Sequence, residues 1–408
     1  MFAKTDVNEK SAICDMKKNI FISTGEVSGD LQGALLIEAL QSGARDAGIS
    51  LTISAVGGDR MAAAGANLLG NTSAIGSVGL LESLPFVLPA WQLQRRIRKF
   101  VRENPPDLVV LIDYMGPNLS LGAYLKAQFP QVPVVYYIAP QAWVWSLSDR
   151  NTQDIVRISD RLLAIFPEEA RFFEKRGATV TWVGHPLVDL LQNAPSRQQA
   201  RERLGIDPDT VAIALLPASR HQELKYLMSA MFEAARQLQA QIPQVRFWIP
   251  LSLETYRESI ENAIATYGLR ATLTSDNPRE VLAAADLAIA KSGTVNLELA
   301  LLDIPQVVLY RVHPVTAWIA RNLLNFKIPF MSPPNLVQMK SIVPELLQEE
   351  ATAENIVAES LELLFNADRR SQMHADYQQM RQAVGEVGAC DRAAKEILQL
   401  SLSDGEMP

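Results

Sequence analysis

Residue types that build metal centres are scarce in this chain. Its 408 residues include two cysteines and four histidines. Cys14 and Cys390 lie near opposite ends of the sequence, and the histidines show no H-x-x-x-H or similar spacing. We therefore expect no metal site. So few cysteines fit a protein of a reducing compartment.

Long apolar runs and blocks of basic residues are also missing. No run of about 18 apolar residues occurs, so no transmembrane helix is predicted. Residues 1–18 are polar and lack the apolar core of a secretory signal, so we expect a flexible N-terminal tail there. The formal net charge is −7, and no Lys/Arg block offsets it. This balance argues against a nucleic-acid-binding protein.

Two series of short apolar runs alternate with helical patterns. The composition, 48% hydrophobic and 20% charged, supports a sizeable core, and the length predicts two or three domains. The alternation pauses over residues 191–203 and then restarts. It is typical of parallel sheets covered on both faces, so we expect an α/β fold of two doubly wound, Rossmann-like domains with a ligand cleft at the carboxyl ends of their strands. The expected strands cover residues 19–23, 50–56, 107–112, 132–138, 161–165, 179–183, 210–216, 246–249, 271–274, 286–290 and 306–310.

The most informative segment is residues 290–301, AKSGTVNLELAL. It follows an apolar run and passes through a glycine turn into a helical pattern. Such a turn directs backbone N–H groups and a helix N-terminus at one spot, which suits a diphosphate. Glu298, one helical turn further on, can accept hydrogen bonds from ribose hydroxyls. The segment is therefore compatible with a nucleotide-sugar site, and equally with an ordinary turn in which Ser292 caps the helix and Glu298 is solvated.

Asp113 directly follows the apolar run DLVVLI. A carboxylate at the carboxyl end of a buried parallel strand lies at the mouth of the expected cleft. Its surroundings there can raise its pKa enough to make it a general base. The alternative is a solvated aspartate that caps the next helix.

In each half of the chain, one polar segment follows the first expected strand. In residues 216–223, LPASRHQE, Arg220 can bind phosphate oxygens through its guanidinium group, or alternatively pair with Glu223. Residues 23–30, STGEVSGD, contain neither G-x-G-x-x-G nor a Walker lysine, so neither NAD nor ATP is indicated. The glycines of this segment permit close approach of a ligand, and a capped turn without a ligand is the alternative.

Apolar and aromatic residues concentrate at two places outside the expected strands. Residues 140–145, PQAWVW, carry two tryptophans that could stack on a sugar or contact an acyl chain, although such residues more often pack a helix start. Residues 75–91 are apolar but interrupted by proline and glycine, which fits either a core segment or a lipid-contacting patch. The basic residues 95–99, RRIRK, favour the lipid patch, because anionic headgroups attract such clusters.

These motifs occur in a characteristic order. The order is STGEVSGD, VGGDRMAAAG, DYMGPN, APQAWVW, VGHPLVD, LPASR, KSGTVNLELAL, SPPNL and PELLQEEAT. Over residues 19–398 the chain resembles the lipid-A-disaccharide synthases, which are inverting glycosyltransferases with a GT-B fold. The resemblance implies a tail over 1–18, an acceptor and lipid domain over 19–190 completed by C-terminal helices over 368–408, and a UDP-sugar-binding domain over 191–367.

The resemblance also implies a reaction and its residues. UDP-2,3-diacylglucosamine would be condensed with 2,3-diacylglucosamine 1-phosphate (lipid X) to give the β-1,6-linked lipid A disaccharide 1-phosphate and UDP, without cofactor or metal. Asp113 would deprotonate the acceptor 6-hydroxyl, and Arg220 would contact the diphosphate. The resemblance further implicates Ser219, Ser292, Gly293, Thr294, Glu298 and Asn335 in UDP-sugar binding, and Glu26, Ser28, Gly29, Asp30, Asn118 and Gln141 on the acceptor or transferred-sugar side.

Members of this family are peripheral proteins of the inner membrane. The resemblance therefore implies a place on its cytoplasmic face, and C-terminal helices that can be exchanged in a homodimer. The expected lipid-contacting residues are Val78, Leu80, Leu81, Leu84, Phe86 and Trp91.

Four departures from the family pattern flank the expected acceptor site. Ala218 replaces the glycine of L-P-G-S-R, AIFPEE replaces L-P-F-E over residues 164–169, residues 115–117 read Met-Gly-Pro, and Ser146 stands where a basic residue is common. They leave the acceptor and the acyl preference open. The alternatives are a transferase for another lipid acceptor, a UDP-GlcNAc epimerase, or a non-catalytic nucleotide-sugar or lipid-binding protein.

Overall fold

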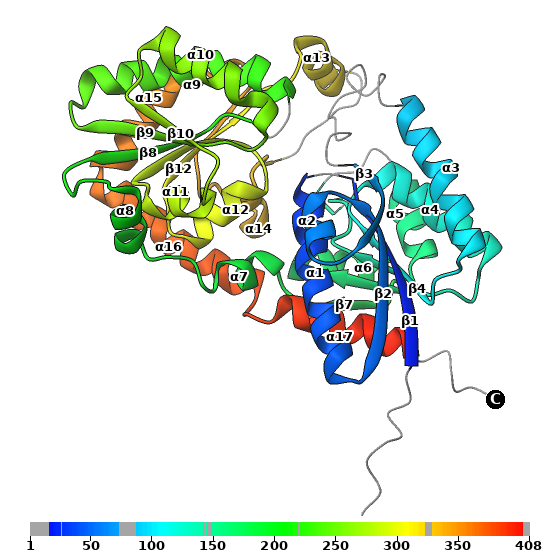
Figure 1. Cartoon of the computed structure of the whole chain (residues 1–408). Helices are drawn as coiled ribbons and strands as arrows, with labels where there is room; N and C mark the ends of the chain where they lie inside the picture. The colour runs from blue at the N-terminus through cyan, green and yellow to red at the C-terminus, as the bar shows by residue number, and fades with distance from the viewer. Residues whose placement is uncertain are drawn as a thin grey trace, which may run out of the picture.

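The chain forms two α/β domains that lie side by side (Figure 1). The computed structural model describes residues 16–25, 27–72, 87–141, 143–144, 149–218, 221–322 and 329–402. Within these residues each domain has one sheet whose paired strands all run parallel. The expected fold class is confirmed.

The first domain contains, within the described residues, a seven-stranded sheet of order β3-β2-β1-β4-β5-β6-β7. Its strands are β1 Met16–Ser23, β2 Ile49–Gly57, β3 Asn67–Asn71, β4 Leu108–Ile112, β5 Val134–Tyr137, β6 Arg161–Ala164 and β7 Val180–Trp182. Its helices are α1 Val27–Asp46, α2 Asp59–Ala63, α3 Val87–Glu103, α4 Met115–Gln128, α5 Asp149–Ile158, α6 Pro167–Glu174 and α7 Pro186–Leu191.

The structure around the central strand β4 explains why all five of its residues are apolar. Leu108, Val110 and Ile112 pack into the core under α1, while Val109 and Leu111 pack into the core under α3, α4 and α5. Successive side chains of a strand point to opposite faces, and helices cover both faces here. Every position of β4 is therefore buried.

The second domain contains, among the residues described, a six-stranded sheet of order β10-β9-β8-β11-β12-β13. Its strands are β8 Val211–Leu216, β9 Val245–Pro250, β10 Ala271–Thr274, β11 Leu287–Lys291, β12 Gln306–Tyr310 and β13 Glu345–Leu347. Its helices are α8 Arg197–Leu204, α9 His221–Gln241, α10 Arg257–Tyr267, α11 Pro278–Ala284, α12 Thr294–Leu301, α13 Pro314–Asn322, α14 Pro333–Gln338 and α15 Ala353–Phe365, with short 3-10 turns η2 Glu254–Tyr256 and η3 Gln348–Glu350.

All the expected strands are present, and two further strands were not expected. These are β3 and β13, each at an edge of its sheet. Both are short and only partly buried, so their side chains do not form the apolar run that marks an interior strand.

The C-terminal helices divide between the two domains. Helix α16 (Ala367–Val384) packs against α12, α14 and α15 of the second domain, whereas α17 (Ala389–Leu402) packs against α1 and α7 of the first (Figure 1). Between them Gly385 and Gly388 adopt positive φ angles of 88° and 93°, which glycine reaches without steric cost. Only α17 completes the first domain, so the expected crossing at residue 368 is corrected to residues 385–388.

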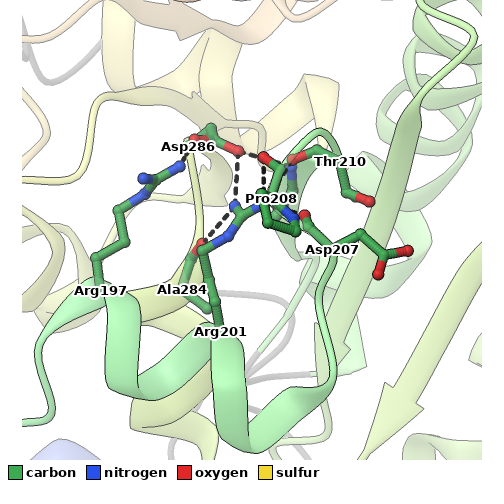
Figure 2. Close-up of polar contacts among 8 residues, drawn as sticks. Arg197, Arg201, Asp207, Pro208, Thr210, Ala284 and Asp286 are labelled. Carbon is green, nitrogen blue, oxygen red and sulfur yellow. Dashed lines mark hydrogen bonds and ion pairs between the residues drawn. The ribbon is translucent and has the colours of Figure 1, made fainter.

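An arginine–aspartate cluster fixes the amino-terminal edge of the second sheet (Figure 2). The Arg201 guanidinium donates to the Asp286 carboxylate at 3.2 Å and to the backbone carbonyls of Asp207 and Thr210 at 2.7 and 2.8 Å. Asp286 also accepts the Ala212 N–H at 2.8 Å. The cluster therefore joins the starts of β8 and β11, at the sheet edge opposite the strands' carboxyl ends.

Candidate active site

A cavity of about 900 Å³ lies where the carboxyl ends of the two sheets face each other. The first domain lines it with residues that follow β1, β4, β5 and β6, and the second with residues that follow β8, β9 and β11. This is the position expected for a ligand cleft in doubly wound domains.

The first-domain wall includes Asp113, held in an unusual backbone turn. Asp113 and Tyr114 have φ angles of 45° and 50°, a left-handed conformation that costs a non-glycine residue about 1–3 kcal/mol. Three hydrogen bonds offset this cost: the Asp113 N–H donates to the Ile138 carbonyl at 3.0 Å, and its carbonyl accepts from Asn118 Nδ2 at 2.9 Å and from the Tyr136 hydroxyl at 2.8 Å. The strained turn places Asp113 on the cavity wall.

Asn118 supports this turn from inside the protein. Its amide nitrogen also donates to the Ile112 carbonyl at 3.1 Å, and its oxygen accepts from the Ser23 hydroxyl at 2.8 Å. The side chain is fully buried and does not line the cavity. The prediction that Asn118 faces the acceptor is wrong on this geometry, because its polar atoms bind the backbone around Asp113.

The segment after β1 meets the cavity through Ser28 and Gly29. Gly29 is required by packing within the protein, since a Cβ there would lie 1.9 Å from Thr24 Oγ1. The prediction that Asp30 faces a ligand is not met, because its buried carboxylate accepts the N–H groups of residues 58, 60 and 61. Asp30 thereby holds the first turn of helix α2 in place and positions Arg60, which lines the cavity.

Aromatic side chains form an apolar part of the same wall. Trp143 packs on Phe166 with ring centroids 5.9 Å apart, and Phe166 packs on His185 at 5.3 Å. All three line the cavity, as does Gln141. Burial lowers the pKa of His185 to about 3, and its Nδ1 accepts the Leu187 N–H at 3.1 Å. His185 is therefore a neutral cap of α7.

Glu169 lines the cavity and was not expected there from the sequence. Its carboxylate is buried and accepts N–H groups from Ala139 at 3.1 Å, Ile165 at 2.9 Å and Phe166 at 3.3 Å. Burial raises the pKa of Glu169 to about 7; the three N–H groups act in the opposite direction, and nearby Asp113 adds to the rise. The only sequence signal is a glutamate at the third position of a helix that begins with proline, a common capping pattern.

The second-domain wall is built by the turn between β11 and α12. Ser292, Gly293 and Thr294 all line the cavity. The Ser292 N–H and hydroxyl donate to the carbonyls of Leu309 and Met331, each at 2.8 Å, and the Gly293 N–H donates to Asn296 Oδ1 at 2.7 Å. Internal partners thus use two backbone N–H groups of the turn that were expected to bind an anion. The amino end of α12 still faces the cavity.

Charged residues of both domains meet beside this turn. Glu298 lies 3.6 Å from Arg279 Nε. Burial raises the pKa of Glu298, and Arg279 and Arg60 oppose that rise, so a first-domain arginine acts on a second-domain carboxylate. Lys291 places a further cation on the wall, 3.6 Å from Glu223 Oε1. Neither Arg60 nor Lys291 was expected at the site from the sequence.

Asn335 does not line the cavity, contrary to the prediction. Its buried side chain accepts the N–H groups of Ile342 and Val343 at 2.7 and 2.9 Å and donates to Glu345 Oε1 at 2.8 Å. Glu345 in turn accepts the Met331 N–H at 2.8 Å. Asn335 therefore supports the loop that carries Met331 to the cavity wall.

Several predicted residues lie outside the described part of the chain. These are Glu26, Ser219, Arg220, Val78, Leu80, Leu81, Leu84 and Phe86. Trp91 is described; it is exposed on α3, with the Arg95 guanidinium 4.8 Å from its ring centroid. No described helix is long and apolar enough to span a membrane. Within the described residues no cluster of His, Cys, Asp and Glu is suited to a metal ion.

Comparison with known proteins agrees with the order of the motifs. The family model for lipid-A-disaccharide synthetase matches residues 20–399. Proteins named lipid-A-disaccharide synthase from Gloeothece citriformis and Synechocystis sp. are 59% and 55% identical, over 93% and 94% of this chain and 99% and 98% of their own. One from Myxococcus xanthus is 36% identical over 93% of this chain and 97% of its own.

Solved structures share the fold at low sequence identity. A UDP-GlcNAc 2-epimerase from Neisseria meningitidis is 13% identical with a TM-score of 0.57, over 95% of this chain and all of its own. Acinetobacter baumannii MurG is 15% identical with a TM-score of 0.54, over 94% of this chain and 99% of its own. These likenesses show the two-domain GT-B fold alone. The family match and the identities of the relatives show that the chain belongs to the lipid-A-disaccharide synthetase family.

Proposed function

We propose that the chain transfers a diacylglucosaminyl group from UDP-2,3-diacylglucosamine to 2,3-diacylglucosamine 1-phosphate (lipid X). The acceptor 6-oxygen forms a bond to the anomeric carbon while the bond from that carbon to the diphosphate breaks. The products are the β-1,6-linked disaccharide 1-phosphate and UDP, with inversion at the anomeric carbon. The proton of the acceptor hydroxyl passes to Asp113.

The cavity is the observation that carries this proposal. It has room for a nucleotide sugar, and it is lined by the Asp113 carboxylate from the first domain and by Lys291 and the amino end of α12 from the second. A base and a site for a leaving anion on opposite walls are what a direct displacement needs. The family match supplies the substrate class.

The residue roles follow from charge and position. Asp113 is the proposed general base. Lys291, Arg60 and the amino end of α12 favour the negative charge that develops on the departing diphosphate. Arg220 is proposed for the same task from its place in the LPASR motif. Glu298 is proposed to accept hydrogen bonds from the ribose hydroxyls.

The apolar wall fits acylated substrates. Trp143 and Phe166 offer an aromatic surface on which an acyl chain or the acyl-bearing sugar could pack. We place the enzyme peripherally on the cytoplasmic face of the inner membrane, with Trp91 among its lipid contacts. A homodimer that exchanges C-terminal helices is proposed from the family resemblance.

The proposal is tested by UDP release with and without lipid X, in detergent micelles. Acceptor-dependent release is expected for the wild type and for Asp154→Asn, a control on the surface of α5 where Asp154 pairs with Arg157. Asp113→Asn is expected to lower the rate at least about a hundredfold, because a general base contributes about 10²–10⁴.

Two outcomes would contradict the proposal. Unchanged turnover by Asp113→Asn would remove Asp113 as the base. Conversion of UDP-GlcNAc to UDP-ManNAc, with no disaccharide formed, would assign the site to an epimerase instead.

A further inference from the structure

One peptide group lies between Asp113 and Glu169. The Asp113 N–H donates to the Ile138 carbonyl at 3.0 Å, and the Ala139 N–H donates to Glu169 Oε1 at 3.1 Å. That carbonyl and that N–H belong to the same planar, trans peptide, so its two partners lie on opposite sides of it. We infer that Glu169 is a positioning residue for Asp113, which it holds in place through the Ile138–Ala139 peptide. This role rests on the proposed function, because it takes Asp113 as the base.

The backbone on both sides of this link is strained. Ile138 has a φ angle of 57°, and Asp113 and Tyr114 have φ angles of 45° and 50°. A β-branched residue such as isoleucine rarely adopts this left-handed conformation, which persists only where surrounding contacts impose it. The peptide after Ile138 therefore needs partners that fix its orientation. Asp113 supplies one of them and Glu169 supplies the other.

Glu169 is itself held firmly enough to act as such a partner. Its side chain is 1% exposed, and its second oxygen, Oε2, accepts the N–H groups of Ile165 at 2.9 Å and Phe166 at 3.3 Å. These two residues connect the end of β6 to the start of α6, whereas Ala139 follows the end of β5. Since β4, β5 and β6 are neighbours in the sheet, one carboxylate and one peptide tie together the carboxyl ends of three adjacent strands.

The two carboxylates also act on each other. Both residues line the cavity. Burial raises the pKa of Glu169, and the charge of Asp113 adds to the rise. Charges interact more strongly in a buried site than in water. A change at Glu169 should therefore be felt at Asp113 as well as in the backbone between them.

A simple helix cap is the alternative role for Glu169. The residue occupies the third position of α6, where glutamate or glutamine commonly accepts the N–H that precedes the helix. A cap alone needs only Oε2, whereas the bond to Ala139 uses Oε1. The two roles thus depend on different oxygens of one carboxylate, and a substitution can separate them.

Glu169→Gln keeps the cap and removes the link. The amide has one acceptor oxygen, which is best satisfied where two N–H groups converge, at Ile165 and Phe166. Its NH2 group then faces the Ala139 N–H, and two donors cannot bond to each other. The peptide between Asp113 and Glu169 loses its partner on one side, so the turn at Asp113 loses a support.

The first test is turnover by Glu169→Gln, with Glu168→Gln as the matched control. Glu168 precedes Glu169 on the same helix, and its exposed carboxylate pairs with Arg171. UDP release is measured in detergent micelles over a range of both substrates. Glu169→Gln should lower kcat about tenfold and leave each KM within about twofold, because a displaced base affects the chemical step more than binding. Glu168→Gln should match the wild type, and a wild-type kcat in Glu169→Gln would overturn the inference.

A double-mutant cycle with Asp113→Asn separates positioning from folding. Adding Glu169→Gln to Asp113→Asn should lower the residual turnover no further, because the base that Glu169 positions is already lost. A purely structural role would give losses that multiply, and that result would overturn the inference. Wild-type turnover by Asp113→Asn alone would contradict the proposed function. Wild-type turnover by Glu169→Gln beside a slow Asp113→Asn would contradict the positioning role only.

Hydrogen exchange measured by mass spectrometry follows the same link without turnover. It is made below the melting temperature of each variant, so it does not depend on stability in the turnover assay. In Glu169→Gln the amides of residues 113–118 and of Ala139 should exchange about tenfold faster, while the first turn of α6 keeps its rates. Faster exchange confined to α6 would make Glu169 a cap alone and would overturn the inference.

Discussion

Replacing Arg201 by methionine should destabilise the second domain without disturbing the active site. Arg201 and Arg197 both bind the Asp286 carboxylate, from positions that differ in burial (Figure 2). The Arg201 side chain is 8% exposed, whereas that of Arg197 is 53% exposed. The two substitutions therefore test the same carboxylate with a buried and an exposed partner.

The expected magnitude follows from the groups left without partners. Methionine keeps the apolar stem but removes the donors to the Asp207 and Thr210 carbonyls and to Asp286. Removing one partner of a buried ion pair costs about 3–5 kcal/mol. Asp286 is 22% exposed and keeps Arg197 and the Ala212 N–H, so we expect the lower end, about 3 kcal/mol.

Hydrogen exchange measured by mass spectrometry is the suitable assay, because a two-domain protein need not unfold in one step. Amides of β8 and β11 should exchange about a hundredfold faster in Arg201→Met, while those of β1 and β4 keep their rates. Arg197→Met should lose less than about 1 kcal/mol, as exposed pairs do. Turnover below the unfolding temperature should stay near wild type, because the cluster lies at the edge opposite the cavity. Equal losses for the two variants, or a loss below about 1 kcal/mol for Arg201→Met, would refute the reasoning.

Three further predictions concern the site and its supports. Burial raises the pKa of Glu169 from 4.5 to about 7, so between these pH values the folded protein binds a proton that the unfolded chain has released. The protonated Glu169 therefore stabilises the folded state at low pH, and this stabilisation is lost as the pH rises from 4.5 through 7. Glu169→Gln should flatten this fall, worth about 3 kcal/mol, in thermal melts across that range; an unchanged pH slope would contradict the assignment. Asp189→Ala removes the acceptor of the N–H groups of residues 388–390 and should destabilise the start of α17 by about 1–2 kcal/mol, measured as faster proteolysis between α16 and α17. Asn118→Ala frees the turn at Asp113 and should lower kcat about tenfold with little change in KM, in a protein whose thermal melt shows it folded at the assay temperature; an unchanged kcat would contradict this role.

The interior strands could be predicted from the sequence because helices cover both faces of each sheet, so these strands are continuous apolar runs. The run DLVVLI predicted β4 because all five strand positions are buried. Edge strands such as β3 gave no such signal, since solvent reaches most of their side chains. The crossing between domains was placed too early, because α16 and α17 each bury one face and only the domain against which they pack differs.

Which side chains of a turn face the cavity was harder to predict than where the turn lies in the sequence. Asp113 and Gly293 lie on the wall as expected, because the carboxyl ends of parallel strands meet at one edge of each sheet. Asp30, Asn118 and Asn335 lie in the same motifs but bind backbone groups inside the protein. A polar residue in a turn can satisfy a ligand or the chain itself, and the sequence does not distinguish these outcomes.

The sequence by itself determined the class of fold, the family and the turns that build the site, because local apolar patterns and motif order carry that information. Only the tertiary structure decided which side chains face the cavity. Glu169 shows the physical reason: its raised pKa comes from burial by distant segments and from Asp113, 56 positions earlier in the chain. Likewise Arg60 acts on Glu298 only because the two domains face each other, a relation that no local pattern contains.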